Sequence, residues 1–149
     1  EEAGRGFPSN LTLALFNIEY IEELFAPGEL TRIYLNFSDP WPKNRHAERR
    51  LTHPRFLVKY KQILNEHGEI YLRTDSPSLF EFSLNSFADY GLRMADITFD
   101  MHRDGVPEGH VMTEYETKFA SQGMPIYGCR VIVGSEALRR HQANISGER

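Results

Sequence analysis

The sequence predicts one α/β domain built on a mainly parallel sheet. Its 149 residues are enough for a single compact domain and too few for two ordinary ones. Apolar residues make up 40% of the chain and charged residues 26%, which argues against wholesale disorder. Expected strands and helices alternate along the chain without an internal repeat, an order typical of a parallel sheet.

The first 42 residues contain two expected strands. Residues 11–16 form a short apolar run that predicts a strand, and residues 19–25 predict a helix or turn closed by a Pro-Gly pair. Residues 32–38 alternate apolar and polar side chains and predict a second strand. The two prolines within residues 39–42 forbid continued ladder pairing, so this strand must end in a rigid loop.

The middle of the chain predicts helix, strand and helix. A helix with one apolar stripe is expected from Pro54, with Gly68 as its left-handed C-terminal cap. Residues 69–74 predict a strand, and Asp75-Ser76-Pro77 a turn that caps the next helix. That helix is expected over residues 79–90, ended by a glycine.

The last third predicts two more strands. Residues 92–101 are expected to form a long strand, followed by a polar loop at 103–109 and a short helix at 113–122. Residues 126–133 predict the final strand. Residues 134–149 are polar and predict a flexible tail.

Composition excludes several classes of protein. The single cysteine, Cys129, excludes an internal disulfide framework and multi-thiolate zinc sites, and mid-strand it is expected to be a buried core thiol. No apolar stretch approaches the roughly 18 to 20 residues of a membrane span, and residues 1–20 do not resemble a signal peptide. The histidines lack metal-ligand spacing. We therefore expect a cytoplasmic protein without a metal site or membrane contact.

One basic cluster stands out against a net charge of -4. It lies between residues 43 and 55, where two histidines interleave with basic residues and only one acid occurs. Most charge runs are solvated surface, but this one directly follows a strand end, which favours binding of a nucleotide polyanion. The basic residues are Lys43, Arg45, Arg49, Arg50 and Arg55.

Two aspartates follow expected strands. In open α/β sheets ligands bind outside the carboxyl ends of the strands, where Asp39 is expected to lie. An Asx turn that holds the loop at Pro40 is an equally good interpretation of Asp39. Asp75 repeats the pattern one unit later, as a capping turn or a second ligand contact. Trp41, between two prolines, is either a stiff stacking surface or a core residue.

The run from Tyr34 to Phe56 contains DPWPK, then RH and RRL, and resembles the bacterial tRNA (guanine-N7)-methyltransferases. The segments RTD, MTEYE and PIY continue the resemblance in order, so that it covers residues 10 to about 133. It implies a Rossmann-like class I methyltransferase with a three-layer α/β sheet. It also implies a methyl group transferred from S-adenosylmethionine to N7 of a guanine in the tRNA variable loop.

The resemblance also implies roles for individual residues. Asp39 would be the catalytic carboxylate, also near the methyl donor, and Asn17 would lie near the donor's adenine, where the family usually has an aspartate. Lys43 and Asp75 would contact the substrate. The family's TxYE substrate-binding motif is matched by Thr113, Glu114, Tyr115 and Glu116. Phosphates of tRNA would be held by Arg45, His46, Arg49 and Arg50.

One part of the family pattern is absent from this sequence. The family begins with a strand, a Glu-x-Gly-x-Gly-x-Gly loop and a second strand, and the chain has neither strand nor loop. We therefore expect the C-terminal portion of the domain, in one unit, with an unpaired edge at residues 32–38 and a monomeric or homodimeric state. The alternative function is a truncated, catalytically inactive RNA-binding remnant of the family.

Overall fold

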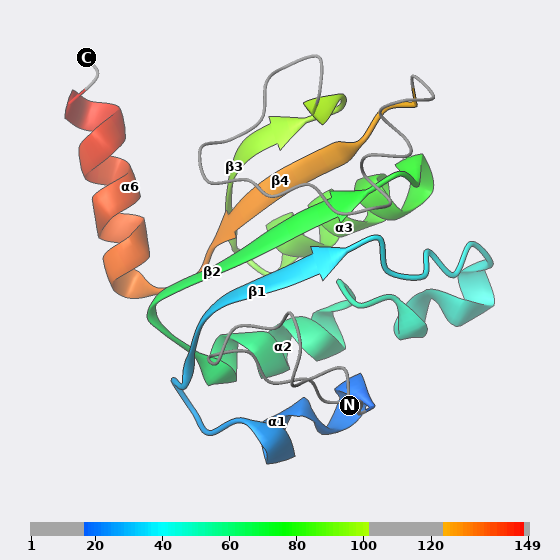
Figure 1. Ribbon diagram of the computed structural model, residues 1–149, viewed down its shortest axis with the longest axis horizontal. Coiled ribbons are helices and arrows are strands. Elements are labelled where there is room, and N and C mark those ends of the chain that lie inside the picture. Colours follow the sequence, from blue (N-terminus) through cyan, green and yellow to red (C-terminus); the bar gives the residue numbers. More distant parts are fainter. Residues whose placement is uncertain (1–16, 102–123, 148–149) are drawn as a thin grey trace, which may run out of the picture.

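A four-stranded sheet is the centre of the computed structural model, which describes residues 17–101 and 124–147 (Figure 1). The strand order is β1-β2-β4-β3. β1 and β2 are parallel, whereas β4 is antiparallel to both of its neighbours, so the expectation of a mainly parallel sheet is wrong for the described strands. The strands are β1 (Leu30–Asn36), β2 (Leu64–Thr74), β3 (Arg93–Thr98) and β4 (Tyr127–Ile132).

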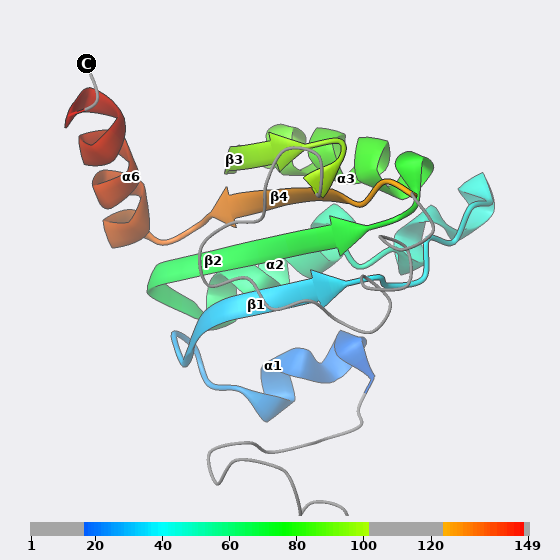
Figure 2. The ribbon, with the colours of Figure 1, turned by 45° about the horizontal axis from the view of Figure 1, so that its top comes forward.

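Two long helices connect the strands and cover one face of the sheet. Figure 2 shows α2 and α3 behind the sheet, while α6 stands at the end of the sheet where β1 and β2 begin. Short helices precede β1 and follow it. The helices are η2 (Ile18–Tyr20), α1 (Ile21–Leu24), η3 (Asn44–Arg49), α2 (Pro54–Ile63), α3 (Pro77–Asp89) and α6 (Ser135–Gly147).

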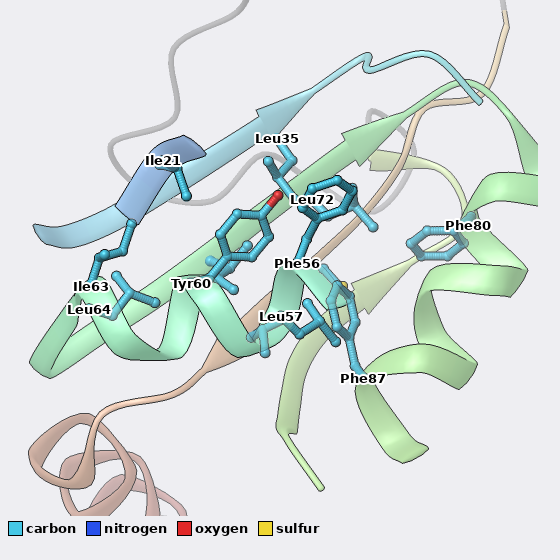
Figure 3. Packing of buried hydrophobic residues seen from close by; sticks show 13 residues of the cluster. Ile21, Leu35, Phe56, Leu57, Tyr60, Ile63, Leu64, Leu72, Phe80 and Phe87 are labelled. Carbon is cyan, nitrogen blue, oxygen red and sulfur yellow. The ribbon is translucent and has the colours of Figure 1, made fainter. Parts of the chain in front are cut away.

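The alternation of side chains along the strands separates an apolar face from a polar one. Leu35, Leu72 and Cys129 occupy one row across three strands, and all are buried. They pack with Phe56 and Phe87 of the two covering helices (Figure 3). Burial raises the pKa of the Cys129 thiol to about 12. The expectation of a core thiol is confirmed.

The next row of the sheet faces the other way. Tyr34, Tyr71 and Arg130 are aligned across β1, β2 and β4, one residue before or after the apolar row. Successive strand residues point to opposite faces, so these side chains lie on the face away from α2 and α3. One face therefore holds the core and the other holds charged and aromatic groups.

The glycine expected to end α2 has a different role. The helix ends at Ile63, and the capping Leu64 is already extended, with φ -83° and ψ 141°. Gly68 lies inside β2, where an added Cβ would come within 2.6 Å of the Leu64 Cβ. The prediction of a cap at Gly68 is wrong, because close approach rather than left-handed backbone requires this glycine.

The other boundaries of helices and strands either match those predicted from the sequence or differ from them by a few residues. Ser76 caps α3 by accepting a hydrogen bond from the Leu79 N–H (3.2 Å), as predicted. β3 ends at Thr98, earlier than expected, and its pairing with β4 shifts register between Ala95 and Thr98, around Asp96, where φ is +56°. The helix α6 occupies the segment predicted as a polar tail.

Some predicted elements lie outside the described residues. They are the strand at 11–16, the loop at 103–109 and the helix at 113–122. Among the helices of the described part, none has the length and apolar character needed to cross a membrane.

Candidate active site

The carboxyl ends of β1 and β2 bring the two predicted aspartates to one rim of the sheet. The strands pair in parallel up to Asn36 and Arg73, and the Phe37 N–H extends the ladder by donating to the Arg73 carbonyl at 2.8 Å. Asp39 and Asp75 follow within three residues, and both are exposed. The expectation that they follow neighbouring strands is confirmed.

Asp39 is held in a strained turn. Its Oδ1 accepts a hydrogen bond from the Trp41 N–H at 3.1 Å, which is the Asx turn that one interpretation predicted. Phe37 and Trp41, on either side, have φ of +55° and +44°. Left-handed backbone at non-glycine residues costs about 1–3 kcal/mol each and clusters at functional sites. The turn uses only Oδ1, so the second carboxylate oxygen can serve a ligand.

Trp41 is not a core residue. Its ring is half-buried, the Arg49 guanidinium lies over it at 4.9 Å, and the His46 ring meets it edge-on at 5.5 Å. The aromatic face attracts the cation without cancelling its charge. The prediction of a stiff aromatic surface beside Asp39 therefore stands, and the core interpretation of Trp41 is wrong.

Arg50 faces the protein interior. Only 8% of the residue is exposed, its Nε donates to the Trp41 carbonyl at 3.1 Å, and its guanidinium lies 4.6 Å from the centre of the Phe82 ring. The residue thereby ties the tryptophan turn to α3. The sequence predicted a phosphate contact at Arg50, and that role remains a prediction.

The other basic residues of the cluster surround the turn. Lys43 precedes η3 and is exposed, and Arg45 is exposed on η3 with its Nε 3.5 Å from the His46 Nε2. Within the described residues, these cations and Arg49 have no carboxylate partner at ion-pair distance. Their charge is thus available to a polyanion.

Buried hydroxyl groups anchor the end of the basic turn, residues 43–55, to α3. They were not predicted from the sequence. The Thr52 and Ser83 hydroxyls share a hydrogen bond of 2.7 Å, and the Ser86 hydroxyl donates to the Thr52 carbonyl. All three residues are buried. The only signal in the sequence was the presence of small polar residues on the inward side of α3.

Comparisons with known proteins identify the family. A family model described as "Putative methyltransferase" matches residues 2–129. The chain belongs to this family.

Relatives with assigned names indicate which methyltransferases this chain is similar to. The tRNA (guanine-N(7)-)-methyltransferase of Bacillus velezensis is 49% identical over 122 residues, covering 82% of this chain and 56% of the relative. That of Bacillus licheniformis is 52% identical over 118 residues, covering 79% and 55%. The predicted resemblance is confirmed, and the chain spans about half the length of these curated relatives.

A solved structure gives a weaker match. It is the geranyl diphosphate C-methyltransferase of Streptomyces coelicolor A3(2), which is 14% identical with a TM-score of 0.43. The match covers 82% of this chain and 53% of that one.

The remaining predicted site residues are only partly described. Asn17 is exposed, and its Oδ1 accepts the Glu19 N–H at 2.9 Å, which caps η2. Glu19 in turn pairs with Arg55 at 3.1 Å, so Asn17 lies close to the base of the basic turn. The contact of Asn17 with the methyl donor stays a prediction. The motif at residues 113–116 lies outside the described residues.

The described residues offer little to a metal ion. They contain no group of three or more His, Cys, Asp or Glu side chains placed to hold one.

Proposed function

We propose that this chain takes part in the transfer of a methyl group from S-adenosylmethionine to N7 of a guanine in tRNA. The observation that carries the proposal is the exposed Asp39 at the rim, held by a strained turn beside cations that have no carboxylate partner at ion-pair distance within the described residues. The family and the names of the relatives support the same activity. Cytoplasm is the proposed compartment, and a monomer or homodimer the proposed state.

The rim fits the proposed donor as one wall of its site. Asp39 and Asn17 are exposed. The free carboxylate oxygen of Asp39 and the second lone pair of the Asn17 Oδ1, which also accepts the Glu19 N–H, are acceptors for amino or hydroxyl groups of a ligand. When bound, S-adenosylmethionine supplies an electrophilic methyl group on a positively charged sulfur. No described residue has to form a covalent bond in this chemistry.

The reaction asks the protein mainly for positioning. Guanine N7 carries an in-plane lone pair and no proton at neutral pH, so it attacks a methyl group without a strong general base. The task is to align N7, the methyl carbon and sulfur, with the guanine freed from its tRNA contacts. Trp41, held by Arg50, provides a fixed aromatic wall for that purpose.

Asp39 acts by electrostatics. The guanine ring gains positive charge as the methyl group arrives, so a fixed carboxylate beside it stabilises the transition state more than the neutral ground state. Lys43 and the exposed arginines of η3 hold tRNA phosphates. The carboxylate and the cations therefore act on different parts of the same substrate.

A nucleoside analysis tests the proposal. The protein is incubated with bacterial tRNA and S-adenosylmethionine, and the digested tRNA is examined by mass spectrometry. We expect 7-methylguanosine to accumulate. Methylation of another nucleoside, or methylation that is unchanged by Asp39→Ala, would contradict the proposal.

A further inference from the structure

A second polar site lies at the other end of the sheet. α6 stands at the end of the sheet where β1 and β2 begin (Figure 1). Residues of α6 and of the strands line an open pocket of about 530 Å³. Residues 135–147 follow the segment matched by the family, so that match assigns nothing to this helix. The lining includes Arg32, Glu69, Tyr71, Arg130, Arg140 and Asn144.

The pocket has a positive balance, with three arginines against one glutamate. Glu69 is fully engaged: its Oε2 lies 2.7 Å from Arg130, its Oε1 lies 3.9 Å from Arg32, and the same oxygen accepts from the Tyr71 hydroxyl at 3.0 Å. Arg130 also pairs with Asp96 at 3.0 Å. The strand side of the pocket is thus a fixed network in which Arg130 and Tyr71 already donate to carboxylates.

Arg140 is the cation that this network does not neutralise. It is exposed on α6, and within the described residues it has no carboxylate partner at ion-pair distance. Its neighbour Arg139 differs, because it pairs with Glu136 at 2.6 Å on the helix surface. Only Arg140 of the two lines the pocket.

We propose that this pocket binds the phosphate group of a nucleotide, either free or within an RNA strand. Guanidinium groups match phosphate oxygens in geometry and charge, and the Asn144 amide adds a further donor. The volume exceeds that of a lone phosphate and lies in the range of small-ligand sites.

Aromatic side chains beside the pocket favour a nucleotide over inorganic phosphate. The Tyr34 ring stacks on Tyr71 at 5.1 Å and remains 49% exposed. An exposed ring next to a basic pocket is the combination that binds a base and its phosphate together. The site is separate from the rim, because Arg32 lies about 13 Å along β1 from Asn36, at ~3.3 Å per residue.

Calorimetry on the 149-residue chain tests this site without any measurement of methyl transfer. The ligands are inorganic phosphate, guanosine 5′-monophosphate and a short single-stranded RNA. Arg140→Glu should weaken nucleotide binding about tenfold, and Asn144→Ala about threefold. Arg139→Glu, which changes net charge equally outside the pocket, should change it less than twofold.

Comparison of the RNA with the free nucleotide distinguishes the two sources of phosphate. RNA affinity that falls in Arg140→Glu would assign the pocket to an RNA strand, whereas a loss of nucleotide affinity with unchanged RNA affinity would assign it to a free nucleotide. Circular dichroism checks that each variant is folded. Equal losses of nucleotide affinity in Arg140→Glu and Arg139→Glu would overturn the proposal. So would the absence of binding of any of the three ligands by the wild-type chain.

Discussion

The two ends of the sheet hold their least exposed arginines in different ways. At the carboxyl end, Arg49 and Arg50 lie over the rings of Trp41 and Phe82. At the amino end, Arg130 is paired with carboxylates. An aromatic partner orients a guanidinium and leaves its charge, whereas a carboxylate partner cancels it. We therefore expect the carboxyl end to attract a polyanion more strongly, while Arg140 is the arginine lining the amino-end pocket that has no carboxylate partner within the described residues.

The two arginines of the rim differ from each other as well. Arg49 is exposed, while Arg50 is buried and holds the tryptophan turn. We therefore expect Arg49 to contact a ligand and Arg50 to position the turn.

Replacement of Arg50 should have the largest effect on stability. Arg50→Ala removes a hydrogen bond from a charged donor and a packed cation–ring contact, so the free energy of unfolding should fall by about 2 kcal/mol. Arg49→Ala removes only an exposed ring contact and should cost less than about 1 kcal/mol. Urea unfolding followed by circular dichroism measures both. Equal losses would mean that the two residues do not divide these roles.

Charge reversal at Arg49 should have a smaller effect, and on binding rather than stability. Arg49→Glu should weaken tRNA binding and reduce the slope of log K against log salt by about one, as expected for one lost phosphate contact. Affinities measured at several salt concentrations give the slope. Arg139→Glu is the matched control, and an unchanged slope for Arg49→Glu would remove Arg49 from the tRNA surface.

The smallest expected effect concerns pH at the base of the rim. The His53 Nδ1 accepts the Arg55 N–H at 3.1 Å and caps α2, which requires the neutral ring. Burial, and secondarily the charge of Arg55, lower the pKa of His53 below 6.5. The stability from this cap is present above pH 6.5 and is lost as pH falls through the lowered pKa.

Histidine resonances followed by NMR during an acid titration, with urea unfolding at pH 7.5 and pH 5, measure this effect. His53→Asn keeps a capping acceptor without titration and should remove this part of the pH dependence. A His53 pKa above 6.5 would contradict the assignment.

The rim was predictable because its parts are close in sequence. The strand end, Asp39, Trp41 and the basic turn lie within some twenty residues, and turn chemistry places them together whatever the rest of the fold does. The burial of the Arg50 side chain was not predictable, because it depends on a contact with Phe82 of a later helix. Gly68 was misread for a similar reason, since its constraint is the nearby Leu64 side chain rather than a local turn.

The pocket at the amino end of the sheet could not be predicted from the sequence. Its lining comes from β1, β2, β4 and α6, which only the folded sheet brings together. The helix α6 also lacks an apolar stripe, and Ala137 is its one buried residue among those described. A helix that packs through charged and small side chains looks like a polar tail in the sequence.

We expect the Asp39 carboxylate to promote methyl transfer by electrostatics and not by binding tRNA. The most direct test compares wild type with Asp39→Asn, which preserves the turn acceptor and removes the charge, in single-turnover methyl transfer to tRNA and in tRNA affinity. We expect the rate to fall about 100-fold or more, with tRNA affinity within twofold. A rate within a few-fold of wild type, or a loss explained entirely by weaker tRNA binding, would contradict the account.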